Sequence, residues 1–461
     1  MSKTFQSRRM ISRRHFLQLV GLGGAGLALA GCAGAPAAQS TAKGTPVVAK
    51  GGEFDWKKYS GKTVRVLAAN EPATSFIEPR LPQFEKLTGI KLNWEKLPED
   101  QQRQKLAVEL ASGVSDLDVY SSQTGQEGLQ YMNAGWYELL QPWIENKELT
   151  APDYDFADFD PNAVKQLGEV NDKIIGIPDY AITFPLYYRK DLLDKAQLKV
   201  PETMDDLEAA AKKLKSGDVF GITLRGKQAA AVGTWAPFML NMDGSWLDAN
   251  GKPAISAPNT VASIELYGRL LREAGPPGTI NMNWTECQNL WLQGKAALFS
   301  DSSAFVGNFE DPKQSKVVNE VGYALLPVGK NGKQQPGLNG WVMAMNPKSK
   351  NKEPGWYFIQ WASNKAMCDA KQAYGIQQAR KSAWQSEAFQ KGLGAKHPDL
   401  VKVLLEAYAK GKADLYPPFV NVAKARDIIG LVIVTAIQGG DVKGAAQQAD
   451  QQLLELQKAT S

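Results

Sequence analysis

The sequence predicts an α/β protein that is long enough to form two lobes. From Lys62 onward, short β-rich runs alternate with amphipathic helical segments, a pattern typical of βαβ units around a mainly parallel sheet. The chain has 461 residues, of which 43% are hydrophobic, so each of two lobes could bury its own core. Charged residues make up 22%, a share typical of a folded chain rather than a disordered one.

The start of the folded part shows the alternation most clearly. The elements that we predict there are strands over 64–67, 90–94 and 117–120 and helices over 76–87 and 99–111. Ligands of such sheets bind beyond the carboxyl ends of the strands. We therefore expect functional side chains near 69–71 and 121–123.

Two further patterns bear on the fold. Asn-Gly pairs at 250–251 and 331–332 predict hairpin turns, because this dipeptide suits tight two-residue connections. Residues 425–437 are very apolar. They are too few to span a bilayer, which takes about 20 residues, so they predict a core helix.

The N-terminus has the features of an export signal. A twin-arginine pair, Arg13-Arg14, precedes an apolar stretch over 16–30 that ends in small residues. The stretch Leu29-Ala30-Gly31-Cys32 resembles a bacterial lipobox. This resemblance implies that residues 1–31 are a signal peptide and that Cys32 carries a lipid, followed by a flexible tether over 32–55.

Composition excludes several kinds of site. Residues 1–31 hold five basic residues and no acidic one, and the remainder has 48 of each, so nucleic-acid binding through phosphates is not expected. The chain has two histidines, one of them in the signal segment, and three cysteines without a CxxC pair. We therefore predict no metal and no cofactor. Cys287 and Cys368 are expected to be buried thiols, with a disulfide between them left open.

Several segments, taken in order, resemble the extracellular solute-binding proteins of carbohydrate ABC importers. They are Asp172–Tyr180, Leu186–Leu192, Pro201–Leu207, Gln293–Leu298, Gly340–Met345, Ser349–Glu353 and Ala379–Ser382. The resemblance spans roughly residues 62–458. Arg225-Gly226-Lys227 and residues 234–238 are similar to receptors for sugar alcohols.

This resemblance implies a two-lobed periplasmic-binding-protein fold of type II with a multi-strand hinge. Lobe 1 would comprise 56–178 and 342–379, and lobe 2 would comprise 180–341 and 381–461. A hinge with several crossings permits a rotation that closes the cleft. The expected protein is a monomer outside the cytoplasm, anchored to the membrane through Cys32, that delivers a sugar or polyol to an ABC permease and is not an enzyme.

A sugar or polyol requires aromatic faces for its C–H groups and paired donors and acceptors for its hydroxyls. The aromatic candidates are Trp341 and Tyr180 at the predicted crossings and Trp235 near a helix start, with Trp284 ranked below them. At Trp341, Asn339 and Gly340 are expected to form a flexible approach to the ligand.

The polar candidates lie at strand ends and at the third crossing. Glu71 and Gln123 follow first-lobe strands, and Asp301 is their counterpart after the predicted strand 296–300. Arg380 could donate two hydrogen bonds to neighbouring hydroxyls. For each candidate, a structural role such as a helix cap, a core position or an interlobe ion pair remains open.

Three other interpretations stay open at this point. A secreted glycosidase or lyase would use a pair of carboxylates, which the composition does not exclude. A receptor of the same fold could bind a solute that is not a carbohydrate. A purely structural surface lipoprotein would bind no small molecule.

Overall fold

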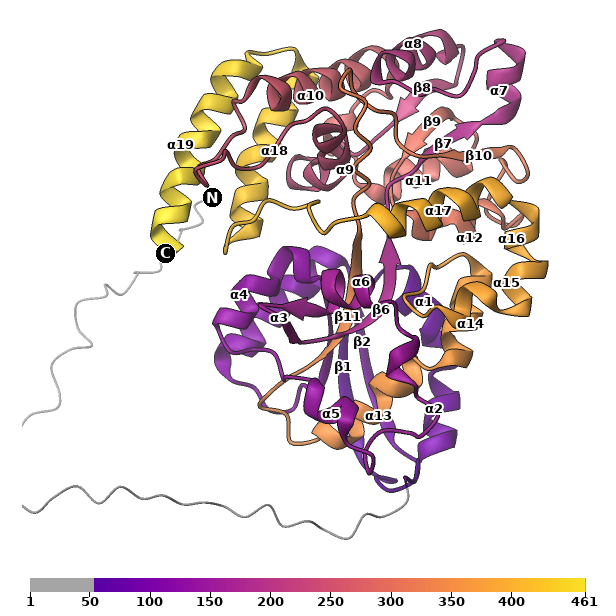
Figure 1. Ribbon diagram of the computed structural model, residues 1–461, viewed down its shortest axis with the longest axis vertical. Coiled ribbons are helices and arrows are strands. Elements are labelled where there is room, and N and C mark those ends of the chain that lie inside the picture. Colours follow the sequence, from indigo (N-terminus) through magenta and orange to yellow (C-terminus); the bar gives the residue numbers. More distant parts are fainter. Residues whose placement is uncertain (1–53, 461) are drawn as a thin grey trace, which may run out of the picture. The chain divides into compact units, whose positions relative to one another are not determined.

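The computed structural model describes residues 54–460 of the chain. The predicted signal peptide, Cys32 and nearly all of the predicted tether lie outside this range. The described part is an α/β structure with two main β-sheets and helices packed around each of them (Figure 1). Among these residues, no helix combines the length and the apolar character needed to cross a membrane.

The first sheet has five strands in the spatial order β2-β1-β3-β11-β6. Its strands are β1 (Thr63–Ala69), β2 (Lys91–Leu97), β3 (Val119–Ser122), β6 (Ile177–Ile182) and β11 (Asn339–Met345). β1 pairs in parallel with β2 and β3, whereas β11 is antiparallel to both β3 and β6. The predicted parallel arrangement is confirmed for the three N-terminal strands, and only β11 runs against the other four.

Helices pack on both sides of this sheet, with α3 and α4 on one side and α2 and α13 on the other (Figure 1). Their bounds are α1 (Pro72–Ile77), α2 (Leu81–Thr88), α3 (Glu99–Ser112), α4 (Leu129–Asn133), α5 (Gln141–Glu145), α6 (Pro161–Ala163), α13 (Lys352–Ala362) and α14 (Lys365–Tyr374). Buried aromatic rings, among them Phe84, Tyr120 and Trp356, fill the core between helices and sheet.

The prediction of one continuous helix over 76–87 is wrong. The segment forms α1, a 3₁₀ turn over Glu78–Arg80 and then α2. Pro79 and Pro82 explain the interruption, because proline lacks the N–H of a helical hydrogen bond and its ring crowds the preceding turn. The helix still ends where Gly89 takes a left-handed conformation with φ of 72°.

The second sheet has four strands in the order β10-β7-β9-β8. They are β7 (Leu186–Arg189), β8 (Phe220–Thr223), β9 (Ala296–Ser300) and β10 (Val321–Ala324). β8 pairs in parallel with β9, and β7 is antiparallel to β9 and β10. A separate two-stranded ribbon joins β4 (Glu169–Val170) to β5 (Lys173–Ile174).

Most of the remaining helices surround the second sheet. They are α7 (Lys190–Lys195), α8 (Met204–Leu214), α9 (Gln228–Asn241), α10 (Pro258–Arg269), α11 (Trp284–Leu292), α12 (Val306–Phe309), α15 (Glu387–Lys391), α16 (Leu393–Lys396), α17 (Pro398–Lys410), α18 (Val422–Gln438) and α19 (Val442–Thr460). The predicted core helix over 425–437 is confirmed as α18, which buries Ile429 and Ile433 against its neighbours and exposes Leu431.

The two Asn-Gly pairs have different outcomes. Asn250-Gly251 forms the predicted tight turn, in which the Gly251 amide donates to the Asp248 carbonyl at 3.0 Å. At Asn331-Gly332 the chain turns but forms no hairpin. There β10 ends at Ala324 and pairs with β7, whereas the next strand, β11, joins the first sheet. The partner of each strand is set by tertiary packing rather than by the local turn.

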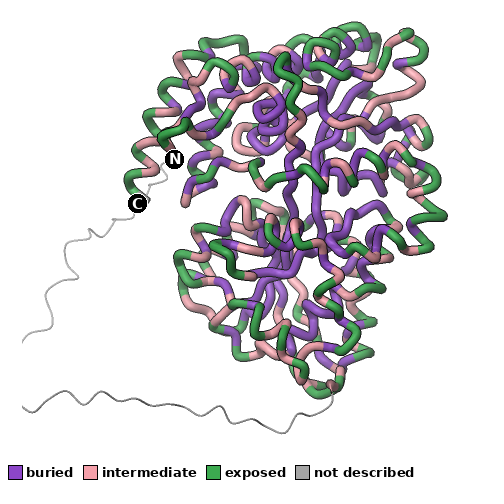
Figure 2. Tube along the Cα trace, viewed as in Figure 1, coloured by how far each residue is buried: buried purple, intermediate pink, exposed green. Residues whose placement is uncertain are grey.

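β6 and β11 extend side by side from the first sheet toward the second (Figure 1), and buried residues continue along both segments (Figure 2). The segment just after β6 is tied to the turn that follows β9 of the second sheet, because the Thr183 amide donates to the Ser303 hydroxyl at 3.0 Å. A third segment, which follows α14, lies beside β6, since the Ala181 amide donates to the Gln377 carbonyl at 3.0 Å. The exact lobe boundaries stay a prediction.

Cys287 on α11 and Cys368 on α14 are both free and buried. Burial raises the pKa of the Cys287 thiol to about 12 and that of Cys368 to about 11. Both side chains therefore stay protonated at neutral pH and act as small apolar groups.

Trp235 lies in the core of the second lobe and not at the cleft predicted for it. Its side chain is fully buried, its indole N–H donates to the Ser263 hydroxyl at 3.1 Å, and its ring packs edge-on against Trp246. Trp235 lies in the middle of α9, within the run Ala231–Asn241 that is buried throughout, and not near the helix start as predicted.

We predict that Trp235→Ala lowers the free energy of unfolding by about 3–5 kcal/mol, because it leaves a cavity the size of an indole and removes the hydrogen bond from the indole to Ser263. Urea denaturation measures this change. Leu431→Ala is the control, since that side chain is 54% exposed and its loss should cost less than about 0.5 kcal/mol. A loss at Trp235 as small as the loss at Leu431 would contradict the core assignment.

Candidate functional site

The ends of strands from both sheets converge on one cleft. On the first side, Glu71 follows β1, Gln123 follows β3, and Trp341 lies near the start of β11. On the second side, Arg225 follows β8 and Ser302 follows β9. All five residues line the same cavity, which is the place expected for ligands of such sheets.

The cleft has three adjoining parts. The central compartment, of about 40 Å³, contains these five residues together with Tyr180 and Glu99. The α3 compartment, of about 550 Å³, opens between α3 and the start of α18 and shares Glu99 and Arg225 with the centre. The α1 compartment, of about 500 Å³, opens between α1 and α11 and shares Glu71 and Trp284 with the centre.

Five of the residues proposed from the sequence line the central compartment. They are Glu71, Gln123, Tyr180, Trp284 and Trp341. Tyr180 and Trp341 are direct cross-strand partners in the pairing of β6 with β11. Arg103 from α3 lies against Trp341, with its guanidinium carbon 4.9 Å from the ring centroid. The indole is thus held between a strand and a cation.

Asn339 and Gly340 stabilise this arrangement without lining the central compartment. The Asn339 amide donates to the Tyr416 hydroxyl at 3.2 Å. A side chain at position 340 would bring a Cβ atom within 2.4 Å of the Tyr180 carbonyl oxygen. Glycine is therefore needed for β11 to approach β6, and not for the flexible contact with ligand expected from the sequence.

Asp301 positions another residue and does not face the cleft itself. Its side chain is fully buried and accepts two hydrogen bonds from Arg225, one of them from Nε at 2.7 Å. The Ser302 amide donates to the same carboxylate at 2.7 Å. Arg225, which lines the cleft, is held by this bidentate pair in a fixed orientation.

Arg380 does not line the cleft, so the prediction that it donates hydrogen bonds to the ligand is wrong. Its side chain is fully buried and donates to the backbone carbonyls of Tyr154, Asp155 and Ser363 at 2.6–2.9 Å. Its guanidinium carbon also lies 4.1 Å from the Phe159 ring centroid. With these donors already used, Arg380 fixes the loop before α6 instead of binding a ligand.

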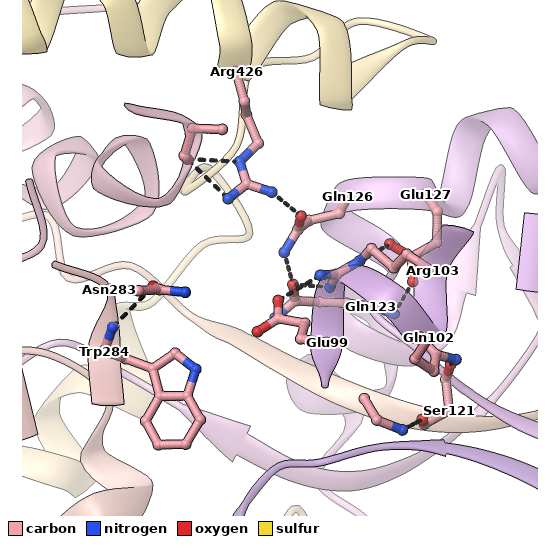
Figure 3. A network of polar contacts seen from close by, with 12 residues as sticks. Glu99, Gln102, Arg103, Ser121, Gln123, Gln126, Glu127, Asn283, Trp284 and Arg426 are labelled. Carbon is pink, nitrogen blue, oxygen red and sulfur yellow. Dashed lines mark hydrogen bonds and ion pairs between the residues drawn. The ribbon is translucent and has the colours of Figure 1, made fainter. Parts of the chain in front are cut away.

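A polar network along the α3 compartment was missed by the sequence analysis (Figure 3). Arg103 donates to Glu127 at 3.2 Å and to Gln123 at 3.1 Å, and it also pairs with Glu99. The Glu99–Arg103 pair has the i, i+4 spacing of many surface helices. That spacing alone gave no reason to place the pair in a site.

The same network crosses from the first side of the cleft to the second. Gln126, in the turn Thr124–Gly128, accepts a hydrogen bond from Arg426 of α18 and donates to the Tyr416 hydroxyl at 3.1 Å. Arg426 in turn donates to the Ala229 carbonyl at 2.8 Å. In Figure 3, Trp284 lies across from Glu99 and Arg103, with no dashed contact to either.

The charges of the cleft are nearly balanced and mostly paired. Glu99 and Glu127 are bound by Arg103, and Asp301 is bound by Arg225. Such a lining has no large excess of either sign for an ionic ligand to neutralise. Within residues 54–460, no group of histidine, cysteine, aspartate and glutamate side chains is arranged to hold a metal ion.

Glu71 differs from Glu99, Glu127 and Asp301 because no cation is paired with it. Its carboxylate caps α1, accepting hydrogen bonds from the amides of Ala73 and Thr74 at 2.8 and 2.9 Å. Burial, together with the nearby Asp179 carboxylate, raises the pKa of Glu71 to about 8. At neutral pH this side chain is largely protonated and can both donate and accept hydrogen bonds.

The sequence is similar to those of known extracellular binding proteins. A profile described as bacterial extracellular solute-binding protein matches residues 68–367. The chain is 28% identical over 381 residues to the erythritol/L-threitol-binding protein of Mycolicibacterium smegmatis, covering 77% of this chain and 78% of that protein.

Two solved structures are similar over most of the described chain. One is an ABC transporter solute-binding protein of Agrobacterium radiobacter K84 in complex with ribitol, with a TM-score of 0.79 and 28% identity. The other is from Agrobacterium vitis S4 with bound D-mannitol, with a TM-score of 0.78 and 27% identity. Each match covers 86% of this chain and 99% of the other. The predicted two-lobed α/β fold is thereby confirmed.

We predict that the stability of this protein falls as the pH rises from about 4.5 to about 8. The folded state keeps the Glu71 proton in this range, whereas an unfolded chain, with the ordinary pKa of 4.5, has lost it. Glu71→Gln removes this titration, so the variant should gain stability relative to the parent chain by a few kcal/mol across the window.

Urea denaturation at a series of pH values measures this difference. Glu286→Gln is the matched control, because Glu286 also belongs to a capping box but is exposed on α11. Its pH profile should follow that of the parent chain. A constant offset between Glu71→Gln and the parent at every pH would show that the pKa of Glu71 is the same in the folded and unfolded chains, and would contradict the raised pKa.

Proposed function

Because the chain belongs to the family of bacterial extracellular solute-binding proteins, we propose that it captures a sugar alcohol or sugar between its lobes and delivers it to an ABC permease. The observation that carries this proposal is the central compartment. There Trp341 and Tyr180 from the first sheet and Arg225, which follows a strand of the second sheet, line one cavity. The similar proteins named for erythritol and solved with ribitol and mannitol support a polyol in particular.

Each lining group suits one feature of a polyol. The Trp341 ring offers an apolar face for C–H groups, and Arg103 behind it fixes the orientation of that face. Arg225 offers two parallel N–H groups to neighbouring hydroxyls. Gln123 offers its amide N–H groups, because its Oε1 already accepts from Arg103, and protonated Glu71 supplies a further donor. Because the charged groups are paired with one another, a neutral ligand leaves none of them unbalanced.

Binding between the lobes couples capture to closure. A ligand that touches Trp341 and Gln123 on one side and Arg225 and Ser302 on the other gains its full set of contacts only when the cleft is closed. Such a ligand shifts the population toward the closed form by its difference in affinity for the two forms. A permease could then recognise the loaded protein by its shape.

The main alternative is a carbohydrate-cleaving enzyme with two carboxylates. Glu99 and Glu127 are both bound by Arg103, and Glu127 accepts a further bond from the Gln123 amide at 2.8 Å. Charge pairing of this kind suits a positioning role better than proton transfer to a leaving group. The family and the similar proteins are binding proteins. Incubation with oligosaccharides and detection of released sugar would separate the two functions.

We expect that ribitol, mannitol or erythritol raises the melting temperature in a concentration-dependent way. Binding to the folded state alone adds about 2.7 kcal/mol at a concentration of 100 times Kd. Calorimetry should then give at least a tenfold weaker Kd for Trp341→Ala, equivalent to about 1.4 kcal/mol. Glutamate and phosphate, as charged solutes, should have no effect.

Trp143→Ala is the matched control for this experiment, because Trp143 lies on α5 away from the cleft and is only half-buried. Its affinity should equal that of the parent chain. A screen in which no polyol or sugar stabilises the protein would favour the interpretation as a purely structural lipoprotein. An equal loss of affinity in both variants would mean that Trp341 acts only through the fold.

The extracellular family implies a place outside the cytoplasm, and we further propose that Cys32 anchors the chain to the membrane. Expressed in a bacterium with lipoprotein processing, the parent chain should sediment with membranes, and Cys32→Ser should appear in the soluble fraction. Ala33→Ser is the control and should remain with the membranes. Equal partition of all three forms, measured by immunoblot, would exclude a lipid at Cys32.

A further inference from the structure

The α1 compartment differs in chemistry from the rest of the cleft. It holds about 500 Å³ on the far side of Glu71 from α3. Four aromatic rings line it, those of Phe76, Trp284, Phe305 and Tyr374. The α3 compartment, of similar size, is lined instead by charged and amide groups, with Tyr131 as its single ring. The cleft therefore offers two large spaces of unlike character.

The aromatic rings are arranged in two pairs. Trp284 and Phe305, on the side of the second lobe, are stacked at 5.6 Å with an angle of 29° between their planes. Phe76 and Tyr374 pack at 5.4 Å, and the Arg80 guanidinium covers Phe76 at 3.6 Å from its centroid. Contact with these neighbours restricts the rings, so that they present fixed apolar surfaces to the compartment.

The polar groups of the α1 compartment are mostly neutral. They include Asn70, Ser75, Thr285, Gln288 and Asn308. Gln288 is 6% exposed, and its amide nitrogen has no hydrogen-bond partner in the structure. The two charged residues are already engaged, since Glu71 caps α1 and Arg80 donates to the Phe76 carbonyl. Aromatic faces with neutral amides and hydroxyls suit a sugar ring, whose C–H faces are apolar and whose edge carries hydroxyls.

The central compartment is a narrow junction of about 40 Å³ between the two large spaces. It shares Glu99 and Arg225 with the α3 compartment and Trp284 and Phe305 with the α1 compartment. A single alditol of four to six carbons would occupy only one side. A ligand with two units joined by a slender link would occupy both.

We propose that the preferred ligand is a glycosyl alditol, with an open-chain polyol in the α3 and central compartments and a sugar ring in the α1 compartment. This inference rests on the proposed function and names the class of ligand more closely. The polyol meets the paired charges around Arg225 and Arg103, and the ring lies against the Trp284–Phe305 pair. The α1 compartment thereby selects for the size of the ligand.

Calorimetry with maltitol, which is sorbitol carrying one glucose ring, tests this inference against sorbitol alone. The parent chain should bind maltitol at least tenfold more tightly than sorbitol. Thr285→Trp places a large side chain at the mouth of the α1 compartment, from an exposed position near the start of α11. It should abolish the preference and leave the affinity for sorbitol unchanged.

Asn289→Trp is the matched control, because Asn289 is exposed one turn further along α11 and does not line the compartment. It should keep the preference for maltitol. Ser75→Trp approaches from α1 on the opposite wall and should repeat the effect of Thr285→Trp. Thermal denaturation reports whether each variant folds, and one folded variant of the two is enough for the test.

Three results would overturn the inference while leaving the proposed function intact. They are equal affinities for sorbitol and maltitol in the parent chain, a preference that survives both blocking substitutions, and binding of maltose as tight as that of maltitol. If neither these compounds nor erythritol, ribitol and mannitol bind, the proposed function itself fails.

Discussion

The pairing of β6 with β11 is the interaction on which the site depends. These strands belong to the first sheet, continue toward the second, and supply Tyr180 and Trp341 as direct neighbours in the cleft. The pairing is close because Gly340 has no side chain to meet the Tyr180 carbonyl. One set of backbone hydrogen bonds therefore fixes both the connection between the lobes and the spacing of the two rings.

Around these rings, charged side chains are partly or fully buried, and the guanidinium groups of Arg103 and Arg225 are paired with carboxylates. Charged groups are costly to bury unless each has a partner. Here Arg103 is shared among Glu99, Glu127 and Gln123, and Arg225 is held by Asp301. The guanidinium groups keep their geometry because they are already bonded within the protein. The cleft can thus be rich in donors and acceptors while remaining close to neutral.

The sequence predicted the three N-terminal strands, β9, the core helix α18 and five residues of the site, because strand ends and crossings leave a local signature. Glu71 and Gln123 directly follow apolar strands, and Trp341 adjoins an Asn-Gly pair. Arg380 and Trp235 were misplaced because burial depends on neighbours far along the chain, such as Tyr154 for the former and Trp246 for the latter.

Gln126 contacts both Arg426 and Tyr416 on the opposite lobe, at the edge of the α3 compartment. These bonds join protein to protein, so opening the cleft must break them whatever the cleft contains. The lifetime of the loaded complex is therefore set in part by bonds between protein side chains, in addition to those made to the cargo. Residence time and selectivity become separable properties, and evolution could lengthen or shorten the one without altering the other.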